Sequence, residues 1–411
     1  MPKVILQVYP TAGNLEQMQA RRPIGRDADT YQELLESLVE LVQAADELGY
    51  WGITHVEHHM HSEGLEISPA PLLLNLYLGR YTKRLRHGQL GLVLPAHDPL
   101  RLAEEIAIVD HMLKGRLFVG MARGYQARWQ NILCQRFNVT STTSDQGDAD
   151  QRNRLLFEEN YKIMKAAWTN DLLRYKGPTY EIPFPYEEGI KNWPPTQTTT
   201  LPYGVPGEVD ADGTVRAVSI VPSPYTKPHP QLFQAFGASP RTLEWCGEED
   251  VTPTILAGPI ENVKHLMSMY QQGAASKGRS VAFGQGTGLC RTIYFTSDDA
   301  DLYSAVERYE APVWNGWYRP FGFMEALRLP GEEGPVLKPG EHLAERLVNS
   351  KQLIAGNVDE VKRQLEELLN EAPMDYLVWL FHWGLIPRDE ALRTLELFAT
   401  KVMPEFGLVA A

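Results

Sequence analysis

Short apolar runs alternate with helical periods along most of this chain. Runs that are apolar almost throughout are typical of strands buried on both faces. They predict strands at residues 4–9, 51–56, 85–94, 116–122, 232–237, 252–256, 289–296 and 376–381. Between them, apolar residues recur every three or four positions, which is the spacing of amphipathic helices. This spacing predicts helices over residues 30–48, 69–81, 99–113, 151–168, from 240 onward, 260–276, 298–311, 358–370 and 388–403.

Capping residues predict where several of these helices begin. Thr30 and Glu33 have the spacing of a capping box. Ser68-Pro69, Asp98-Pro99 and Ser239-Pro240 each combine an N-cap residue with a proline suited to the first helical turn.

The alternation of strand and helix indicates βα units with parallel strands, because the connections are too short for other pairings. Eight such units favour a closed (β/α)8 TIM barrel, and we expect one barrel domain over residues 1–411. The alternative is a doubly wound sheet. Its glycine-rich fingerprint should follow the first strand, where the sequence reads Pro10-Thr11-Ala12-Gly13-Asn14 instead.

Two long irregular insertions interrupt this rhythm. Residues 176–230 contain eleven of the 29 prolines, with a hairpin expected around Asp212-Gly213, and residues 315–345 are rich in glycine and proline. Both segments carry large aromatic residues, namely Trp193, Tyr203, Trp314, Trp317, Tyr318 and Phe321. These side chains either cover an active site or pack against the barrel or a partner subunit.

Composition and charge narrow the class of protein. The 411 residues are 43% apolar, and 39 basic against 52 acidic residues give a net charge of −13. An acidic surface disfavours nucleic acids and anionic membranes as partners. We see no apolar stretch long enough for a transmembrane helix and no signal-peptide pattern at the start. The three cysteines are far apart, which fits a cytoplasmic protein without disulfides.

Three polar clusters fall at the carboxyl ends of predicted strands, where barrel enzymes place their active sites. The first contains His55, Glu57, His58, His59 and His61. Histidines in this position act as a general base, bind a metal, or are simply solvated. A metallohydrolase needs further ligands on later strands, and these offer mainly His382. We therefore predict no metal site.

The other two clusters suit an anion. Arg123-Gly124-Tyr125 follows the fourth strand, where an arginine can hold a phosphate beside an exposed backbone, or form a surface salt bridge. Ser239 and Thr242 start a helix whose amide groups and dipole favour an anion, although simple capping also explains them. The two clusters belong to consecutive strands, so a shared phosphate is the sharper hypothesis.

These clusters, in this order, resemble the bacterial luciferase family of flavin-dependent monooxygenases. The resemblance rests on the following short segments: Glu57-His58-His59, Leu92-Val93-Leu94-Pro95 with Pro99, Leu113-Lys114-Gly115-Arg116, Arg123-Gly124, Ser239 with Thr242, Glu244-Trp245, and residues 355–361. It extends over residues 4–171, 229–260 and 352–407.

The resemblance implies a barrel that binds reduced FMN supplied by a separate NAD(P)H-dependent flavin reductase. Dioxygen would form a C4a-peroxyflavin that oxygenates a small organic substrate. Residue by residue, it implies His58 as the active-site base and Arg123, Ser239 and Thr242 as phosphate ligands. It also places Gly124 and Tyr125 beside the flavin ring, with a non-prolyl cis peptide at Leu90-Gly91. Family members commonly dimerise, so a homodimer is expected.

The sequence departs from the luciferases in several places. Ala122 stands where some luciferases have a reactive cysteine, so light emission is not implied, and Ala238 replaces a glutamate. The insertion at 176–230 is absent from luciferase itself. Two alternatives stay open: a deazaflavin-dependent oxidoreductase of the same superfamily, and a flavin-binding protein without turnover.

Overall fold

The computed structural model describes residues 2–143 and 147–408. The chain divides into two compact units. The first extends through Leu92, includes Phe118–Met121, and resumes at Gln231; the second comprises Val93–Leu117 and the described part of Ala122–Pro230. The expectation of one barrel domain with insertions stays a prediction.

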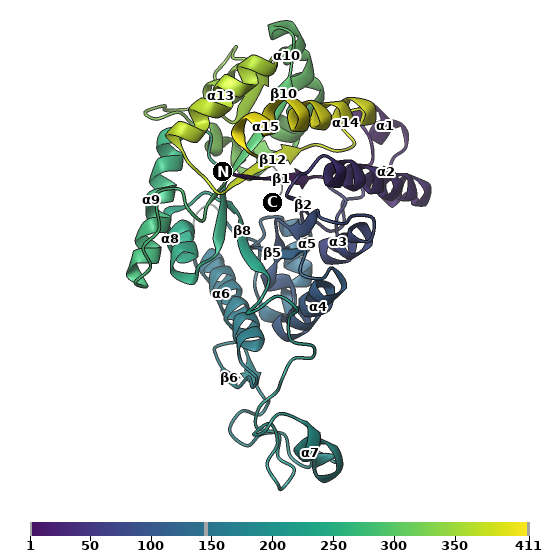
Figure 1. The fold of residues 1–411 in the computed structure, drawn as a ribbon, viewed down its shortest axis with the longest axis vertical. Helices are drawn as coiled ribbons and strands as arrows, with labels where there is room; N and C mark the ends of the chain where they lie inside the picture. Colours follow the sequence, from purple (N-terminus) through teal and green to yellow (C-terminus); the bar gives the residue numbers. More distant parts are fainter. Residues whose placement is uncertain (1, 144–146, 409–411) are drawn as a thin grey trace. The chain divides into compact units, whose positions relative to one another are not determined.

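The first unit contains a closed barrel of eight parallel strands (Figure 1). These strands are β1 (Lys3–Val8), β2 (Gly52–His55), β3 (Arg86–Gln89), β5 (Leu117–Ala122), β8 (Gln231–Gly237), β9 (Thr252–Ile255), β10 (Gly288–Phe295) and β12 (Tyr376–Phe381). They follow one another around the barrel in chain order, and β12 closes it against β1. The predicted TIM barrel is therefore confirmed, and the doubly wound sheet is wrong.

Aromatic rings fill the barrel interior at the amino-terminal ends of its strands. Trp51, Phe118, Phe233 and Tyr376 contact one another with ring centroids 5.0–6.5 Å apart. Gly88 on β3 leaves the space for them, because a Cβ there would lie 2.4 Å from the Phe118 ring. This layer identifies the strand positions that face inward, since side chains alternate along a strand.

The helices of the first unit include those predicted there and two that were not, α1 and α12. They are α1 (Leu15–Ala20), α2 (Ala28–Glu47), α3 (Pro71–Gly79), α8 (Pro240–Glu249), α9 (Ile260–Ser276), α10 (Asp299–Ala305), α12 (Leu343–Asn349), α13 (Val358–Glu371), α14 (Arg388–Leu397) and α15 (Met403–Phe406). A short strand, β11 (Leu353–Gly356), which the sequence pattern did not predict, pairs with β10.

Two predicted helix starts are wrong. Helix α2 begins after Asp27, whose carboxylate accepts hydrogen bonds from the backbone and hydroxyl of Thr30, so no capping box forms at Thr30 and Glu33. Helix α3 begins at Pro71 rather than Pro69. Pro69 and Pro71 both suit the first turn of a helix, and the prediction assigned the earlier of the two. The N-caps at Asp98 and Ser239 are confirmed.

The second unit is mainly helical, with α4 (Pro99–Met112), α5 (Ala127–Leu133) and α6 (Asp148–Thr169). Its proline-rich insertion contains an antiparallel pair, β6 (Tyr175–Lys176) and β7 (Glu181–Ile182), and a short helix, α7 (Leu201–Tyr203). The predicted hairpin around Asp212-Gly213 is confirmed, because Val209 and Val215 form an antiparallel bridge and the backbone amide of Asp210 donates to the carbonyl of Thr214.

The excursion at 315–345 is less irregular than predicted. Short helical turns occupy Trp314–Tyr318, Arg319–Phe321 and Phe323–Leu327, after two earlier turns at Val306–Glu310 and Ala311–Val313 that precede the excursion. Trp314, Tyr318 and Leu327 lie on these turns and are buried. The turns therefore bury one apolar face, as an amphipathic helix does. The glycines and prolines of the segment concealed that spacing.

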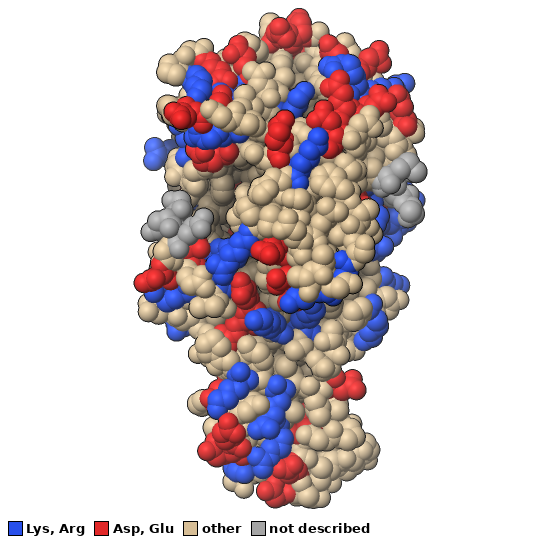
Figure 2. All heavy atoms as spheres, turned by 90° about the vertical axis from the view of Figure 1, so that its left-hand side faces the viewer, with Lys and Arg blue, Asp and Glu red and all other residues tan. Residues whose placement is uncertain are grey.

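Charged side chains of both signs are interspersed on the face drawn in Figure 2. Within the described part of the chain, no helix combines the length and apolar character needed to cross a bilayer. Cys134, Cys246 and Cys290 are all buried thiols.

Candidate functional site

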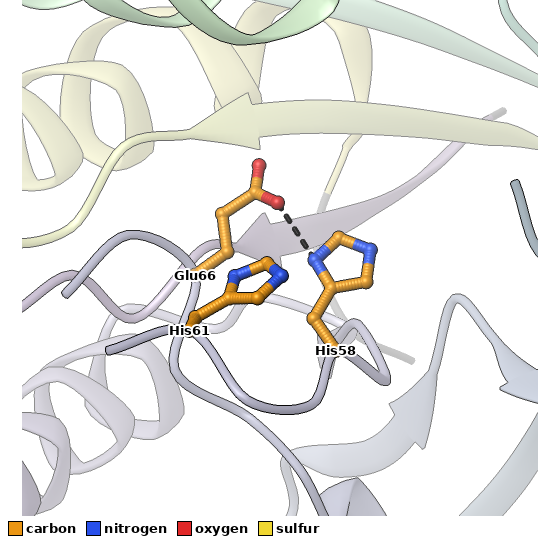
Figure 3. Close-up of side chains that lie close together, drawn as sticks. All are labelled: His58, His61 and Glu66. Atoms are coloured by element: carbon orange, nitrogen blue, oxygen red, sulfur yellow. Dashed lines mark ion pairs between the residues drawn. The ribbon is translucent and has the colours of Figure 1, made fainter. Parts of the chain in front are cut away.

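A buried histidine–carboxylate pair lies just beyond the carboxyl end of β2. Nδ1 of His58 is 2.7 Å from Oε2 of Glu66, and the two side chains are 8% and 4% exposed (Figure 3). The backbone amide of His58 donates to the carbonyl of Ser68, which folds the loop back on itself. This return brings Glu66, eight residues further along the chain, to face His58.

His61 completes the cluster. Its Nδ1 lies 2.7 Å from the carbonyl oxygen of Leu65. A carbonyl oxygen can only accept a hydrogen bond, so Nδ1 carries the hydrogen. In the neutral ring Nε2 is then the unprotonated nitrogen. The rings of His58 and His61 are 5.3 Å apart, and Trp317 contacts His61 edge to face at 5.0 Å. Trp317 of the second excursion thus contacts the cluster, and its role as a cover of an active site stays a prediction.

The other predicted histidines do not join this cluster. His59 pairs with Glu57 at 3.0 Å. His55 is fully buried on β2, and burial lowers its pKa to about 3, so it stays neutral at ordinary pH. Glu66 was missed by the sequence analysis. It stands between the apolar residues Leu65 and Ile67 in a loop, and no spacing rule connects it to His58.

The cluster supports two kinds of chemistry. His58, His61 and Glu66 point toward one another (Figure 3), and their ligand atoms lie within 4.8 Å of each other. Two imidazoles and a carboxylate form the ligand set of many catalytic zinc sites. The same arrangement orients a general base, because the Glu66 carboxylate lies within ion-pair distance of Nδ1 of His58.

Arg123, in the second unit, is fixed by the start of α6. Its Nη2 contacts the carboxylate of Asp150 at 2.5 Å, and its Nε donates to Asn153 at 3.1 Å. Nη1 forms no hydrogen bond or ion pair within the described residues. The guanidinium is therefore positioned by α6 while one of its nitrogens is available to a further anion.

The backbone after Arg123 is equally constrained. Gln130 and Asn153 both donate to the carbonyl of Arg123, at 2.6 and 3.1 Å. Gly124 has a φ of +82°, and a Cβ there would lie 2.3 Å from Oε1 of Gln130. Only glycine fits this position. Tyr125 follows it, with its hydroxyl accepting a hydrogen bond from Gln126.

In the first unit, Ser239 caps α8 as predicted. Its hydroxyl accepts from the backbone amide of Thr242 at 3.3 Å and lies 2.9 Å from the Thr242 hydroxyl. The two hydroxyls thus gather at the amino end of a ten-residue helix, where the dipole favours an anion.

The peptide bond between Leu90 and Gly91 is cis, as the resemblance implies. It follows β3 in the first unit. A Cβ on Gly91 would lie 2.8–2.9 Å from backbone atoms of Gly120 and Met121, so this position also requires glycine. That these two residues contact a flavin stays a prediction.

Comparisons with known proteins agree with this architecture. The chain is 24% identical over 394 residues to the oxygenase component of the flavin-dependent trigonelline monooxygenase of Acinetobacter baylyi, covering 93% of this chain and 92% of that one. Among solved structures, the FMN complex of the oxygenating constituent of 3,6-diketocamphane monooxygenase from Pseudomonas putida superimposes with a TM-score of 0.70. The identity is 19%, over 98% of this chain and 99% of that chain.

An F420-dependent enzyme is also similar in fold. The coenzyme F420-dependent tetrahydromethanopterin reductase of Methanopyrus kandleri gives a TM-score of 0.57 at 13% identity, over 98% of this chain and 99% of that chain. The family model described as luciferase-like monooxygenase matches residues 20–376, which is most of the chain. The protein therefore belongs to the luciferase-like monooxygenase family.

Proposed function

We propose that this protein is the oxygenase component of a two-component monooxygenase that uses reduced FMN and dioxygen to oxygenate a small organic substrate. The observation that carries this proposal is the buried His58–Glu66 pair at the carboxyl end of a barrel strand, in a chain of this family. When bound, reduced FMN supplies the two electrons that activate dioxygen.

His58 is proposed as the residue that takes up and returns a proton. The Glu66 carboxylate, 2.7 Å from Nδ1 of His58, holds the imidazole in place for this exchange. Trp317 and His61 shield this side of the cluster from water, as oxygen transfer requires.

The residues proposed to hold FMN have the chemistry that its parts need. Arg123 offers the guanidinium nitrogen Nη1 to the phosphate, and Ser239 and Thr242 offer hydroxyls at a helix terminus. Leu90, Gly91, Gly124 and Tyr125 are proposed to line the ring, and both glycines allow close approach of the backbone. Similarity in sequence favours FMN over a deazaflavin, because the relative from Acinetobacter baylyi is named flavin-dependent, whereas the F420-dependent reductase is similar in fold alone.

A separate NAD(P)H-dependent flavin reductase is the partner that this proposal needs, since the relative from Acinetobacter is itself named an oxygenase component. We also propose that the protein is a cytoplasmic homodimer.

The decisive experiment is an anaerobic titration with reduced FMN, followed by rapid mixing with oxygenated buffer while absorbance is recorded. We expect saturable binding and a transient spectrum that differs from those of reduced and oxidised FMN. Binding without the transient would favour a flavin-binding protein without turnover. Binding of a reduced deazaflavin alone would overturn the choice of FMN.

Metal analysis of the purified protein tests the prediction that the histidine cluster holds no metal. Stoichiometric zinc retained after dialysis, and lost in His61→Gln, would assign the cluster to metal binding instead. The surface variant His265→Gln serves as the control, because His265 lies on an exposed position of α9.

A further inference from the structure

A second buried histidine–carboxylate pair lies on the other side of β1 from His58. β12 ends at Phe381, and the next residue, His382, has its Nε2 3.1 Å from Oε1 of Glu310. The two side chains are 2% and 0% exposed. In the barrel, β1 lies between β12 and β2, and Val8 pairs with both Phe381 and His55. The two pairs therefore flank a single strand.

By the alternation of side chains along a strand, His382 lies on the same face as the β12 residues that point into the barrel. Tyr376 lies in the interior aromatic layer, and positions 378, 380 and 382 share its face. Tyr9 follows β1, and its ring stacks on His382 with centroids 5.4 Å apart. Trp383 has the opposite parity, and its indole donates to Ser37 of α2 outside the barrel. His382 thus belongs to the mouth of the barrel.

Glu310 is saturated with donors. The Tyr294 hydroxyl donates to Oε1 at 2.8 Å and the Trp314 indole to Oε2 at 2.9 Å, in addition to His382. Burial alone would raise the pKa of Glu310, but the charge of His382 and these hydrogen bonds hold it below its usual value. A carboxylate held this way orients its histidine and does not itself exchange protons at neutral pH.

This contact determines which nitrogen of His382 can exchange a proton. Nε2 donates to Glu310, so Nδ1 is the nitrogen available for proton exchange. Nδ1 forms no hydrogen bond within residues 2–143 and 147–408. The charged and titratable groups that contact the ring or its carboxylate are Tyr9, Glu310 and Tyr294.

One helical segment contains Glu310 and also contacts the histidine cluster around His58. Glu310 is followed seven residues later by Trp317, which contacts His61 beside His58. The segment that covers the His58 cluster is therefore anchored at the barrel mouth through Glu310 and His382.

We propose that His382 is a second proton-holding side chain of the site, exchanging its proton at Nδ1, with Glu310 as its positioning residue. This inference rests on the proposed function. A monooxygenation consumes substrate, O2 and FMNH2 and yields oxygenated substrate, FMN and water. The oxygen atom that leaves as water takes up two protons, and the two imidazole pairs beside β1 provide one acid–base group for each transfer.

The first measurement is the tautomer of His382 by ¹⁵N NMR in the protein without cofactor, with the signal assigned by its loss in His382→Gln. We expect the neutral ring to carry its hydrogen on Nε2. In Glu310→Gln we expect a mixture of tautomers. The matched control is Glu307→Gln, which removes the carboxylate of the half-exposed pair His342–Glu307, also 3.1 Å apart, and should leave His382 unchanged. A hydrogen on Nδ1 in the unsubstituted protein would overturn the proposal.

The second measurement is the pH dependence of single-turnover substrate oxygenation. We expect His382→Gln to slow it about 100-fold and to remove one limb of the pH profile, while reduced-FMN affinity changes by less than about twofold. Added imidazole should restore part of the rate. An unchanged profile would overturn the role of His382 while the proposed function stands. Failure of the unsubstituted protein to bind reduced FMN would overturn the proposed function, and the tautomer result would still be read independently.

Discussion

The histidines that follow β2 in the sequence have different environments in this structure, because each side chain has a different neighbour. His58 faces a carboxylate, His61 faces a carbonyl oxygen, and His55 is fully buried on β2. The sequence identified His58 through its resemblance to a family, but Glu66 and Glu310 were not predicted. Both carboxylates reach their histidines through loop folding and helix packing, and sequence spacing encodes neither.

At His58 we predict that substitution by glutamine slows oxygenation by about 100- to 10,000-fold, because the proton-exchanging nitrogen is lost. Reduced-FMN binding should be nearly unchanged. His59→Gln is the matched control, since His59 pairs with Glu57 outside the cluster. Single-turnover kinetics measure the difference. Equal rates in the His58→Gln variant and the unsubstituted protein would remove His58 from the assigned role.

At Arg123 we predict that substitution by alanine weakens FMN binding roughly 10- to 150-fold, the equivalent of about 1.5–3 kcal/mol, and leaves riboflavin binding almost intact. The reason is that only FMN carries the phosphate. Adding Asp150→Asn to the same chain removes the repulsion from the carboxylate that Arg123 leaves behind. Arg152→Ala, at an exposed position of α6, is the control. A similar loss for both ligands in Arg123→Ala would contradict the phosphate role.

At the scale of elements, the alternation of apolar runs and helical periods predicted all eight barrel strands to within a few residues. It succeeded because parallel strands are buried on both faces and read as apolar runs. It failed at the excursion 315–345, where Tyr318 and Leu327, with Trp314 just before them, are buried on helical turns despite the surrounding glycines and prolines. The conformation of that segment is determined by tertiary packing rather than by local propensity.

Close approach of two strands gives an element-scale prediction. A Cβ at Gly120 on β5 would lie 1.9 Å from the carbonyl oxygen of Gln89 on β3, so the strands must separate to admit it. We expect Gly120→Ala to destabilise the protein by about 3 kcal/mol, measured by urea unfolding. Gly316→Ala is the control, because a Cβ there meets nothing within 4 Å. If both variants unfold at the same urea concentration, the barrel tolerates more separation than this geometry allows.

At the scale of the whole molecule, buried titratable groups tie stability to pH. His55 is fully buried, and its pKa falls to about 3 from a usual value of 6.5. The pKa of Glu310 is also below its usual 4.5. For both groups the unfolded chain binds a proton more readily than the folded one, so both contributions to stability are lost as the pH falls. The two contributions are lost in different pH ranges. That of His55 is lost below about pH 6.5, and that of Glu310 is lost below its usual pKa of 4.5.

This separation makes the contribution of His55 measurable. Between pH 6.5 and 4.5 we expect it to reduce the free energy of unfolding by about 1.4 kcal/mol for each pH unit, because unfolding then takes up one proton at His55. His55→Gln should lower stability at pH 7.5 yet show a shallower fall on acidification, whereas His265→Gln, at an exposed position, should keep the slope of the unsubstituted protein. Urea unfolding at several pH values gives the slopes. Parallel curves for His55→Gln and the unsubstituted protein would mean that His55 takes up its proton in the folded state, and the barrel around β2 would then have to admit water or a counter-charge.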